Sequence, residues 1–211
     1  YLQDSQALEH LQDLFDAQQR AYASNPMPPA GQRQQWLKAL RDLLSDERQA
    51  LINAISQDFS HRSADETQFA ELMPSLHGIH YASKHLKGWM KPSRRAVGLA
   101  FQPASAKVIY QPLGVVGVIV PWNFPINLSF LPLVAIFAAG NRAMVKMSEN
   151  SRHLAALLID KVPAYFPPEK LQFFDETGGV GIEFSKLPFD HLLFTGSGNT
   201  GRSVMAAAAR N

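Results

Sequence analysis

The chain has 211 residues, of which 46% are apolar and 18% charged, and its 20 basic and 18 acidic residues leave a net charge of +2. This much apolar material excludes intrinsic disorder as the dominant state, and so small an excess of base gives no bulk attraction to nucleic acid. Cysteine is absent, which excludes a disulfide scaffold, a zinc–thiolate or iron–sulfur site and a cysteine nucleophile within these residues.

Neither a secretory signal nor a membrane span is evident in the sequence. The chain starts with a polar, amphipathic stretch, and its most apolar segment, residues 128–139, is too short to cross a bilayer. We therefore expect a soluble, cytoplasmic protein without a membrane partner.

Helical periodicity dominates the first hundred residues. Apolar side chains recur at three- and four-residue steps in four segments, residues 8–15, 36–44, 51–59 and 69–86. A proline-rich run at residues 25–29 ends the first helix. Ser45 is predicted to cap the third helix, and Ser63 with Glu66 has the form of a capping box for the fourth.

From about residue 104 the pattern changes to strands that alternate with helices. Strands are predicted at residues 106–110, 114–120, 142–146, 171–174 and 190–194. Helices are predicted between and after the last four, at residues 128–139, 152–166, 182–186 and 200–210. Such alternation indicates an open, mostly parallel sheet with a ligand crevice at the carboxyl ends of its strands.

The fold class is therefore predicted to be α/β, in three parts. Residues 1–103 form a helical layer, residues 104–113 a separate strand, and residues 114–211 a Rossmann-like sheet. The chain stops directly after a helix with no closing strand, which indicates a fragment truncated before a further domain.

A G-x-G-x-x-G motif, Gly196 to Gly201, follows an apolar strand and opens a helix. Small residues let a backbone approach a pyrophosphate, and the free N–H groups of a helix start attract its charge. The motif lies on the last predicted strand rather than the first. A tight turn without a ligand is an equally good interpretation.

Two further signals follow the preceding strands. The run Pro121-Trp122-Asn123-Phe124-Pro125 ends a buried strand, so its Asn123 amide could donate to an oxyanion, although a plain strand-ending turn is favoured on spacing alone. Lys146 and Glu149 follow the next strand and could hold the hydroxyls of a ribose, or form a solvated loop pair. All three signals fall where this architecture places its ligands.

Together these segments resemble the aldehyde dehydrogenase superfamily, most closely its class-3-like branch and the bacterial coniferyl-aldehyde dehydrogenases. The matching segments are PLGVVGVIVPWNFP (112–125), AAGN (138–141), VKMSE (145–149), TGG (177–179) and FDHLLFTGS (189–197). The resemblance implies NAD(P)-dependent oxidation of an aldehyde, of aromatic coniferyl type, to the acid through a thiohemiacetal.

The resemblance also implies a role for each matched residue. Asn123 would supply the side-chain half of an oxyanion hole, the only catalytic residue in the chain. The implied cofactor-binding residues are Val120 and Pro121 at the nicotinamide side, Trp122 beside the phosphates, Lys146, Ser148 and Glu149 at the ribose, Gly178 and Gly179 near the adenine, and Gly196, Ser197 and Gly201 at the pyrophosphate. Glu149 favours NAD, with NADP possible. Met147 stands where the family usually has proline, and we expect a softer turn there.

The catalytic cysteine and general-base glutamate of the family have no counterpart in this chain, so we expect it to be inactive alone. The resemblance implies a homodimer or higher oligomer, in which residues 106–110 belong to an arm that pairs with a neighbouring subunit. Two alternatives remain, a non-catalytic nucleotide-binding or assembly module and a coenzyme-A-acylating enzyme.

No metal site is expected, because His77 and His80 lack a third ligand. The basic stretch of residues 84–95 is predicted to be a solvent-exposed surface without a nucleic-acid partner.

Overall fold

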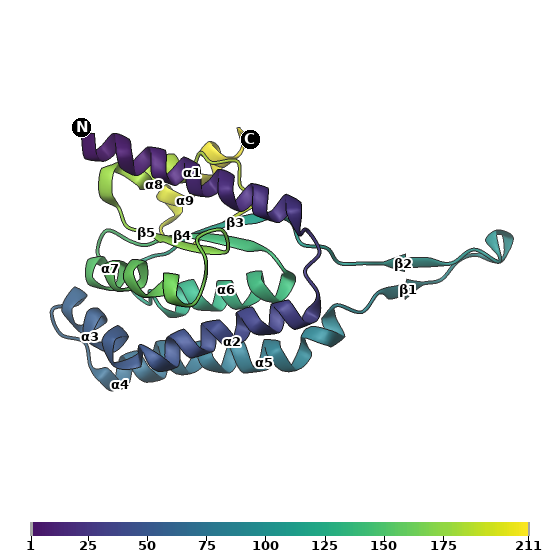
Figure 1. Cartoon of the computed structure of the whole chain (residues 1–211), viewed down its shortest axis with the longest axis horizontal. Helices are drawn as coiled ribbons and strands as arrows, with labels where there is room; N and C mark the ends of the chain where they lie inside the picture. Colours follow the sequence, from purple (N-terminus) through teal and green to yellow (C-terminus); the bar gives the residue numbers. More distant parts are fainter. Residues whose placement is uncertain (1, 211) are drawn as a thin grey trace.

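A four-stranded parallel sheet lies at the centre of the computed structural model, which describes residues 2–210 (Figure 1). The strands are β3 (Val115–Ile119), β4 (Arg142–Lys146), β5 (Leu171–Phe174) and β6 (His191–Phe194). Their order is β5-β4-β3-β6, and every neighbouring pair is parallel. The predicted α/β class and its parallel sheet are confirmed.

Helices cover both faces of this sheet (Figure 1). On one face lie α6 (Asn127–Ala139) and α7 (Arg152–Lys161), and outside them α2 (Ala30–Asp46), α3 (Arg48–Asp58), α4 (Ala64–Thr67) and α5 (Met73–Trp89). On the other face lie α1 (Leu2–Ser24) and α8 (Val180–Phe184), and α9 (Gly198–Ala208) follows β6. The N-terminal helices, predicted as one layer, are thus divided between the two faces.

The alternation of side chains along the strands explains this division. Val115 and Met144 pack with Phe15 of α1, whereas Val116 and Val145 belong to the larger core on the α6 side. All five side chains are at most 2% exposed. Because both faces of a parallel sheet are apolar, each needs a helical cover, and α1 supplies the second one.

The register of the sheet brings the carboxyl ends of its strands to one edge. Ile119 of β3 lies opposite both Lys146 of β4 and Phe194 of β6, and Lys146 lies opposite Phe174 of β5. The loops that follow the four strands therefore leave the sheet side by side, as the sequence predicted.

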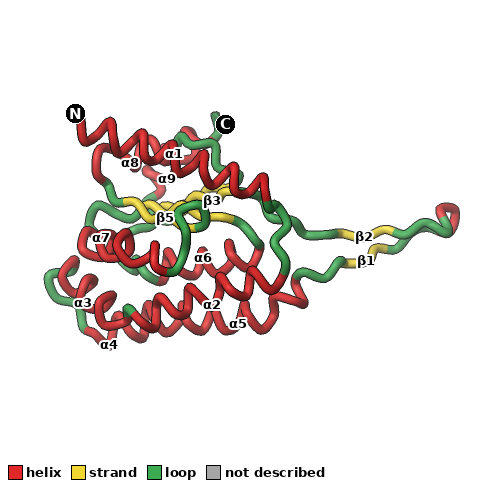
Figure 2. The backbone as a smooth tube through the Cα atoms, viewed as in Figure 1, coloured by secondary structure: helices red, strands yellow, loops and turns green. Residues whose placement is uncertain are grey.

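An antiparallel hairpin of β1 (Ser93–Arg95) and β2 (Ala106–Val108) projects from the body of the molecule (Figure 2). Its second strand was predicted, although as residues 106–110. Its first strand was missed, and it lies in the part assigned to the helical layer, because Ser-Arg-Arg has no apolar alternation and becomes a strand only through pairing. Near the tip, Leu99 is 90% exposed.

Of the two predicted helix caps, Ser45 is wrong, and Ser63 is at the N-cap position but lacks the predicted hydrogen bonds. Ser45 lies inside α2, which continues to Asp46 because the buried Leu43 and Leu44 extend its apolar face. Ser63 precedes α4 but makes no side-chain cap bond. Glu66, expected to complete that cap, instead pairs with Arg62 at 3.1 Å.

Between α2 and α3 the chain turns at Glu47 alone, and a π-helical segment, residues 68–72, joins α4 to α5. Short 3-10 turns follow α7 at residues 162–164 and precede α8 at residues 177–179. Within residues 2–210, no helix combines the length and apolar character that crossing a membrane requires.

Candidate functional site

Backbone hydrogen bonds join the loops at the carboxyl edge of the sheet. The N–H of Val120 donates to the carbonyl of Lys146 at 3.0 Å, and the N–H of Met147 donates to the carbonyl of Phe174 at 2.8 Å. Each loop therefore starts from a position fixed by its neighbour. The side chains that follow β3, β4 and β5 share one end of the fold.

Lys146 is a buried residue, and its ammonium pairs with the carboxylate of Glu176, which follows β5. The interpretation of Lys146 and Glu149 as a solvated loop pair is therefore wrong for the lysine, whose side chain is 9% exposed. An anionic partner offsets the cost of burying the Lys146 ammonium, and that partner is Glu176 rather than the nearby Glu149. Glu149 itself is exposed, with a carboxylate oxygen 3.3 Å from the hydroxyl of Ser148.

A cavity of about 390 Å³ opens beside this ion pair, within the size range of small-molecule sites. It is lined by Ser148, Glu149, Arg152, Asp175, Glu176 and Thr177. The carboxylates and hydroxyls of this lining accept hydrogen bonds from hydroxyl groups, and its three carboxylates outnumber the one guanidinium, that of Arg152, which disfavours an added anion. The cavity thus suits a neutral, hydroxyl-rich group.

Met147 restrains the end of β4. Its side chain is fully buried, and its N–H makes the 2.8 Å bond to Phe174 that a proline has no hydrogen to form. The softer turn expected from methionine in place of proline is therefore offset by a hydrogen bond, which ties the residue after Lys146 to β5.

The loop of residues 121–125 leaves the sheet at the end of β3. Trp122 is 54% exposed, with its ring 6.2 Å from that of Phe59, and Asn123 is also exposed. The carbonyl of Asn123 accepts a 3.0 Å hydrogen bond from the guanidinium of Arg62. The backbone of Asn123, which carries the side-chain amide, is thus held by a residue from outside the loop.

Glu71 completes this support, and sequence reasoning missed both it and Arg62. One carboxylate oxygen accepts from Arg62 at 3.0 Å, and the other accepts from the N–H groups of Ile126 at 2.6 Å and Asn127 at 3.2 Å. Burial raises the pKa of Glu71 to about 7, against the opposing effects of the two N–H groups and of Arg62. No short-range pattern links these residues to the loop, since the loop atoms that they hold lie 55 to 61 positions further along the chain.

Ser197 caps α9 by itself. Its hydroxyl accepts from the N–H of Thr200 at 3.2 Å, and the turn from Gly196 onward is exposed. A Cβ at Gly196 would lie 2.5 Å from the ring of Phe194, and one at Gly201 would lie 3.2 Å from it. Internal packing alone thus explains two of the motif's glycines. A tight turn without a ligand and a phosphate-binding turn are both consistent with this geometry.

Gly178 and Gly179 form a left-handed turn between Thr177 and α8, with φ of 69° and 74°. Nothing lies within 4 Å of a Cβ built on Gly179, so backbone conformation rather than crowding requires the glycine. The turn follows directly from the cavity lining. Its contact with an adenine stays a prediction.

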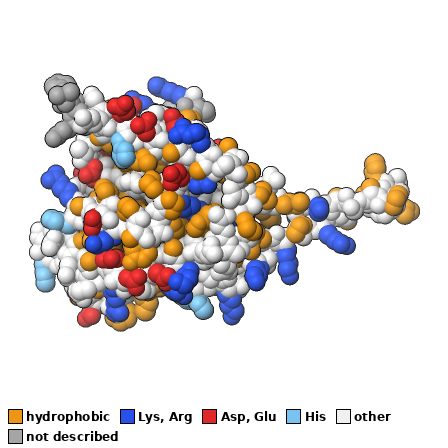
Figure 3. Space-filling model, viewed as in Figure 1, with side chains coloured by type: hydrophobic (Ala, Val, Ile, Leu, Met, Phe, Trp, Pro, Cys, Tyr) orange, Lys and Arg blue, Asp and Glu red, His pale blue; other side chains and the backbone are white. Residues whose placement is uncertain are grey.

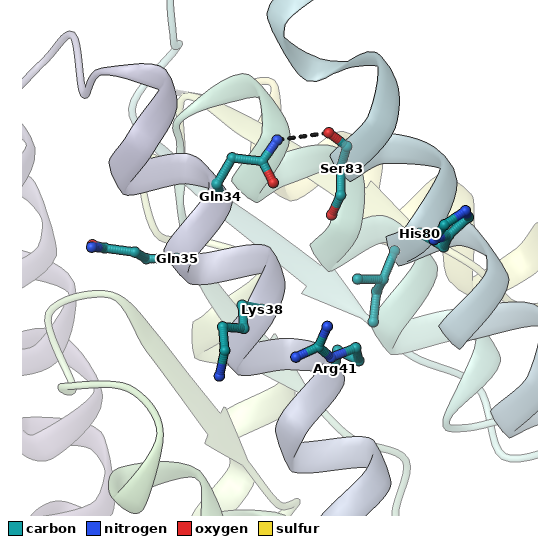
Figure 4. Close-up of a pocket in the computed structure, with 7 residues that line it drawn as sticks. Gln34, Gln35, Lys38, Arg41, His80 and Ser83 are labelled. Carbon is teal, nitrogen blue, oxygen red and sulfur yellow. Dashed lines mark hydrogen bonds between the residues drawn. The ribbon is translucent and has the colours of Figure 1, made fainter.

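Other candidate residues lie away from this edge. His80 lines a hollow between α2 and α5, where the Gln34 amide donates to the carbonyl of Ser83 at 2.6 Å (Figure 4). Among the described residues, no three histidine, cysteine or acidic side chains gather as metal ligands would. The predicted basic surface is exposed along α5 and the start of the arm, where Lys and Arg side chains line one border of the molecule (Figure 3), and it comprises Lys84, Lys87, Lys91, Arg94 and Arg95.

A parallel α/β sheet with a polar cavity and a glycine-rich strand–helix turn at its carboxyl edge defines the Rossmann-like class. Residues 4–211 match the Aldehyde dehydrogenase family, and the chain belongs to this family. The resemblance drawn from five sequence segments is thus confirmed.

Relatives agree with this assignment. The chain is 61% identical, over its whole length and 44% of the relative's, to a protein named Probable coniferyl aldehyde dehydrogenase from Pseudomonas aeruginosa. It is 34% identical to Aldehyde dehydrogenase family 3 member B1 from Mus musculus, over 97% of this chain and 43% of that one. A substrate-bound structure of AldH from Staphylococcus aureus superposes with a TM-score of 0.91 at 27% identity, over 95% of this chain and 44% of that one. The chain therefore spans less than half the length of the relatives it matches.

Proposed function

We propose that the chain is the cofactor-binding part of an NAD(P)-dependent aldehyde dehydrogenase that oxidises an aldehyde to the carboxylic acid. The observation that carries this proposal is the buried Lys146–Glu176 ion pair beside a polar cavity, in a chain that belongs to this family. The name of the Pseudomonas aeruginosa relative supports an aromatic aldehyde of coniferyl type as the substrate.

The residues around the cavity fit the ribose of a dinucleotide. Lys146, Ser148 and Glu149 would hold the ribose hydroxyls, and Glu176 would orient the Lys146 ammonium. The carboxylates repel a 2′-phosphate, which favours NAD over NADP. When bound, the dinucleotide supplies the hydride acceptor.

The phosphates and adenine would lie over the next loops. Gly196 and Ser197 present the start of α9, whose N–H groups and dipole attract an anion, and Gly201 keeps that helix close to β6. The left-handed turn of Gly178 and Gly179 leaves open space beside Gly179, where a planar base would lie.

The redox end would lie at the loop after β3. Val120 and Pro121 would flank the nicotinamide, Trp122 would border the phosphates, and the Asn123 amide would donate to the oxyanion that develops on the aldehyde oxygen. The chain contains no cysteine, so the nucleophile must come from outside these 211 residues. We expect no turnover by this chain alone, and an oligomer built through the arm in the whole protein.

Calorimetry with NAD tests the proposal. We expect Lys146→Ala to weaken NAD binding roughly 10- to 100-fold, because a hydrogen bond from a charged group contributes about 1.5–3 kcal/mol. Lys161→Ala is the control, since Lys161 lies at the end of α7, away from the cavity lining, and pairs with its neighbour Asp160. Equal affinity of the two variants for NAD would contradict the site. Tighter binding of NADP than of NAD would contradict the cofactor preference.

A further inference from the structure

We propose that Arg62 and Glu71 act as positioning residues for Asn123, by holding the loop of residues 121–125 at its middle and at its C-terminal end. We call the pair the Arg62–Glu71 clamp. The inference rests on the proposed function, because it takes the Asn123 amide as the oxyanion donor. It adds two residues that lie outside the strands and loops of the cofactor site.

Arg62 holds the middle of the loop. Its side chain is 4% exposed, and one guanidinium nitrogen donates to the carbonyl of Asn123 and to Glu71, each at 3.0 Å. The guanidinium also lies over the rings of Phe59 and Phe124, 4.8 and 4.9 Å from their centres. Two aromatic faces and three acceptors, with Glu66 as the third, leave the group little freedom, because a planar guanidinium is fixed by stacking and by its fork of donors.

Glu71 holds the end of the loop. Its side chain is fully buried, and one oxygen accepts from the backbone N–H groups of Ile126 and Asn127, where α6 begins. A carboxylate is favourable at a helix N-terminus because it satisfies free N–H groups and the helix dipole. The Asn127 amide donates in turn to the carbonyl of Ala70 at 3.0 Å, so the start of α6 is tied to the segment that carries Glu71.

The spacing of these anchors makes the clamp a positioning device. Arg62 fixes the carbonyl of Asn123, Glu71 fixes the N–H of Ile126, and between them lie Phe124 and Pro125, whose ring restricts the backbone further. An oxyanion donor acts only when it is held within about 0.5 Å of its productive position, since reorganisation during the reaction is costly. The exposed amide of Asn123 therefore depends on its clamped backbone.

Glu66 offers a matched control within the same network. It pairs with another nitrogen of Arg62 at 3.1 Å, but its side chain is 56% exposed. Glu66→Gln therefore removes one carboxylate from Arg62 and leaves the bonds to Asn123 and Ile126 in place.

The test uses the whole protein, assayed for NAD-dependent oxidation of an aromatic aldehyde. Arg62→Lys keeps the charge but loses the planar fork, and we expect kcat to fall roughly 10- to 100-fold, with KM for NAD changed less than about twofold. Asn123→Ala should lower kcat by about 10²- to 10³-fold. The double variant should be no slower than Asn123→Ala, because both changes remove the same function. Faster hydrogen exchange at Ile126 and Asn127 in Arg62→Lys, with exchange in β4 unchanged, separates loop release from unfolding.

Each contrary outcome identifies what has failed. If Arg62→Lys matches Glu66→Gln in kcat and in loop exchange, the clamp is wrong. If the losses of Arg62→Lys and Asn123→Ala multiply, Arg62 acts elsewhere and the clamp is again wrong. If Asn123→Ala leaves kcat unchanged, the oxyanion role in the proposed function is wrong, whatever the other variants do.

Discussion

The loop of residues 121–125 and the turn at Ser197 follow neighbouring strands at the same edge of the sheet, yet they are held in opposite ways. The loop is fixed by Arg62 and Glu71, buried side chains more than 50 positions earlier in the chain. The Ser197 turn is fixed by its own hydroxyl, which accepts from an N–H three residues later. Two loops of one candidate site thus differ in whether the fold or the local sequence holds them.

This difference decides how each loop responds to change. The side chains that hold residues 121–125 are buried, so removal of one partner leaves the other buried and unpaired. The support of Ser197 is exposed, and water can replace it. Substitutions of Arg62 or Glu71 should therefore lower the free energy of unfolding more than substitution of Ser197.

The largest effect is expected from Glu71→Ala. The change leaves the Arg62 guanidinium buried without its fully buried partner and leaves the N–H of Ile126 without an acceptor, at a cost of about 3–5 kcal/mol in the free energy of unfolding. Urea denaturation measures the loss. Glu66→Ala removes an exposed partner of the same arginine and should cost at most about 1 kcal/mol. Similar losses in the two variants would show that burial of the clamp contributes nothing.

The pH dependence of stability should also reveal Glu71. Burial raises its pKa from the ordinary 4.5 to about 7, so the folded state retains a proton that the unfolded state releases. This contribution is complete below pH 4.5 and is lost as the pH rises to about 7, by about 3 kcal/mol at most. Glu71→Gln cannot titrate, so unfolding free energies at pH 5 and pH 8 should differ less in this variant than in the wild type. An identical difference in both would exclude Glu71 as the titrating group.

The smallest effect is expected from Ser197→Ala. Loss of an exposed N-cap should cost about 1 kcal/mol, because the N–H of Thr200 exchanges the serine hydroxyl for water. Ser203→Ala, further along the same helix and also exposed, should leave stability unchanged within about 0.5 kcal/mol. Equal unfolding midpoints for the two variants would mean that the turn needs no cap.

Sequence reasoning succeeded where the controlling interactions are short-range. The sheet follows from the β-branched run at residues 115–119 and from the alternation of strands with helices, and its carboxyl edge follows from the right-handed crossovers that join parallel strands. The helix predicted from residue 200, after the glycine-rich motif, is α9, which begins at Gly198. The partner of Lys146 was misjudged, because Glu149 is near in sequence whereas Glu176 is near through the pairing of β4 with β5.

Helix α7 shows the same limit. Its N-cap residue, Ser151, makes no side-chain cap bond, and the N–H groups of His153 and Leu154 instead donate to the carboxylate of Asp58, at the end of α3. Nothing near residue 151 in the sequence indicates this partner. Only the packing of α3 against α7 brings the carboxylate to the helix start.

The sequence by itself determined the alternation of strands and helices, the edge where the candidate site lies and the family to which the chain belongs. These depend on periodicity, on glycine and proline, and on motifs a few residues long. The tertiary structure alone decided which faces of the sheet the N-terminal helices cover, which carboxylate meets Lys146, and what holds Asn123. The reason is that a buried charge takes whichever partner the packed elements bring to it, and that partner can lie anywhere in the chain.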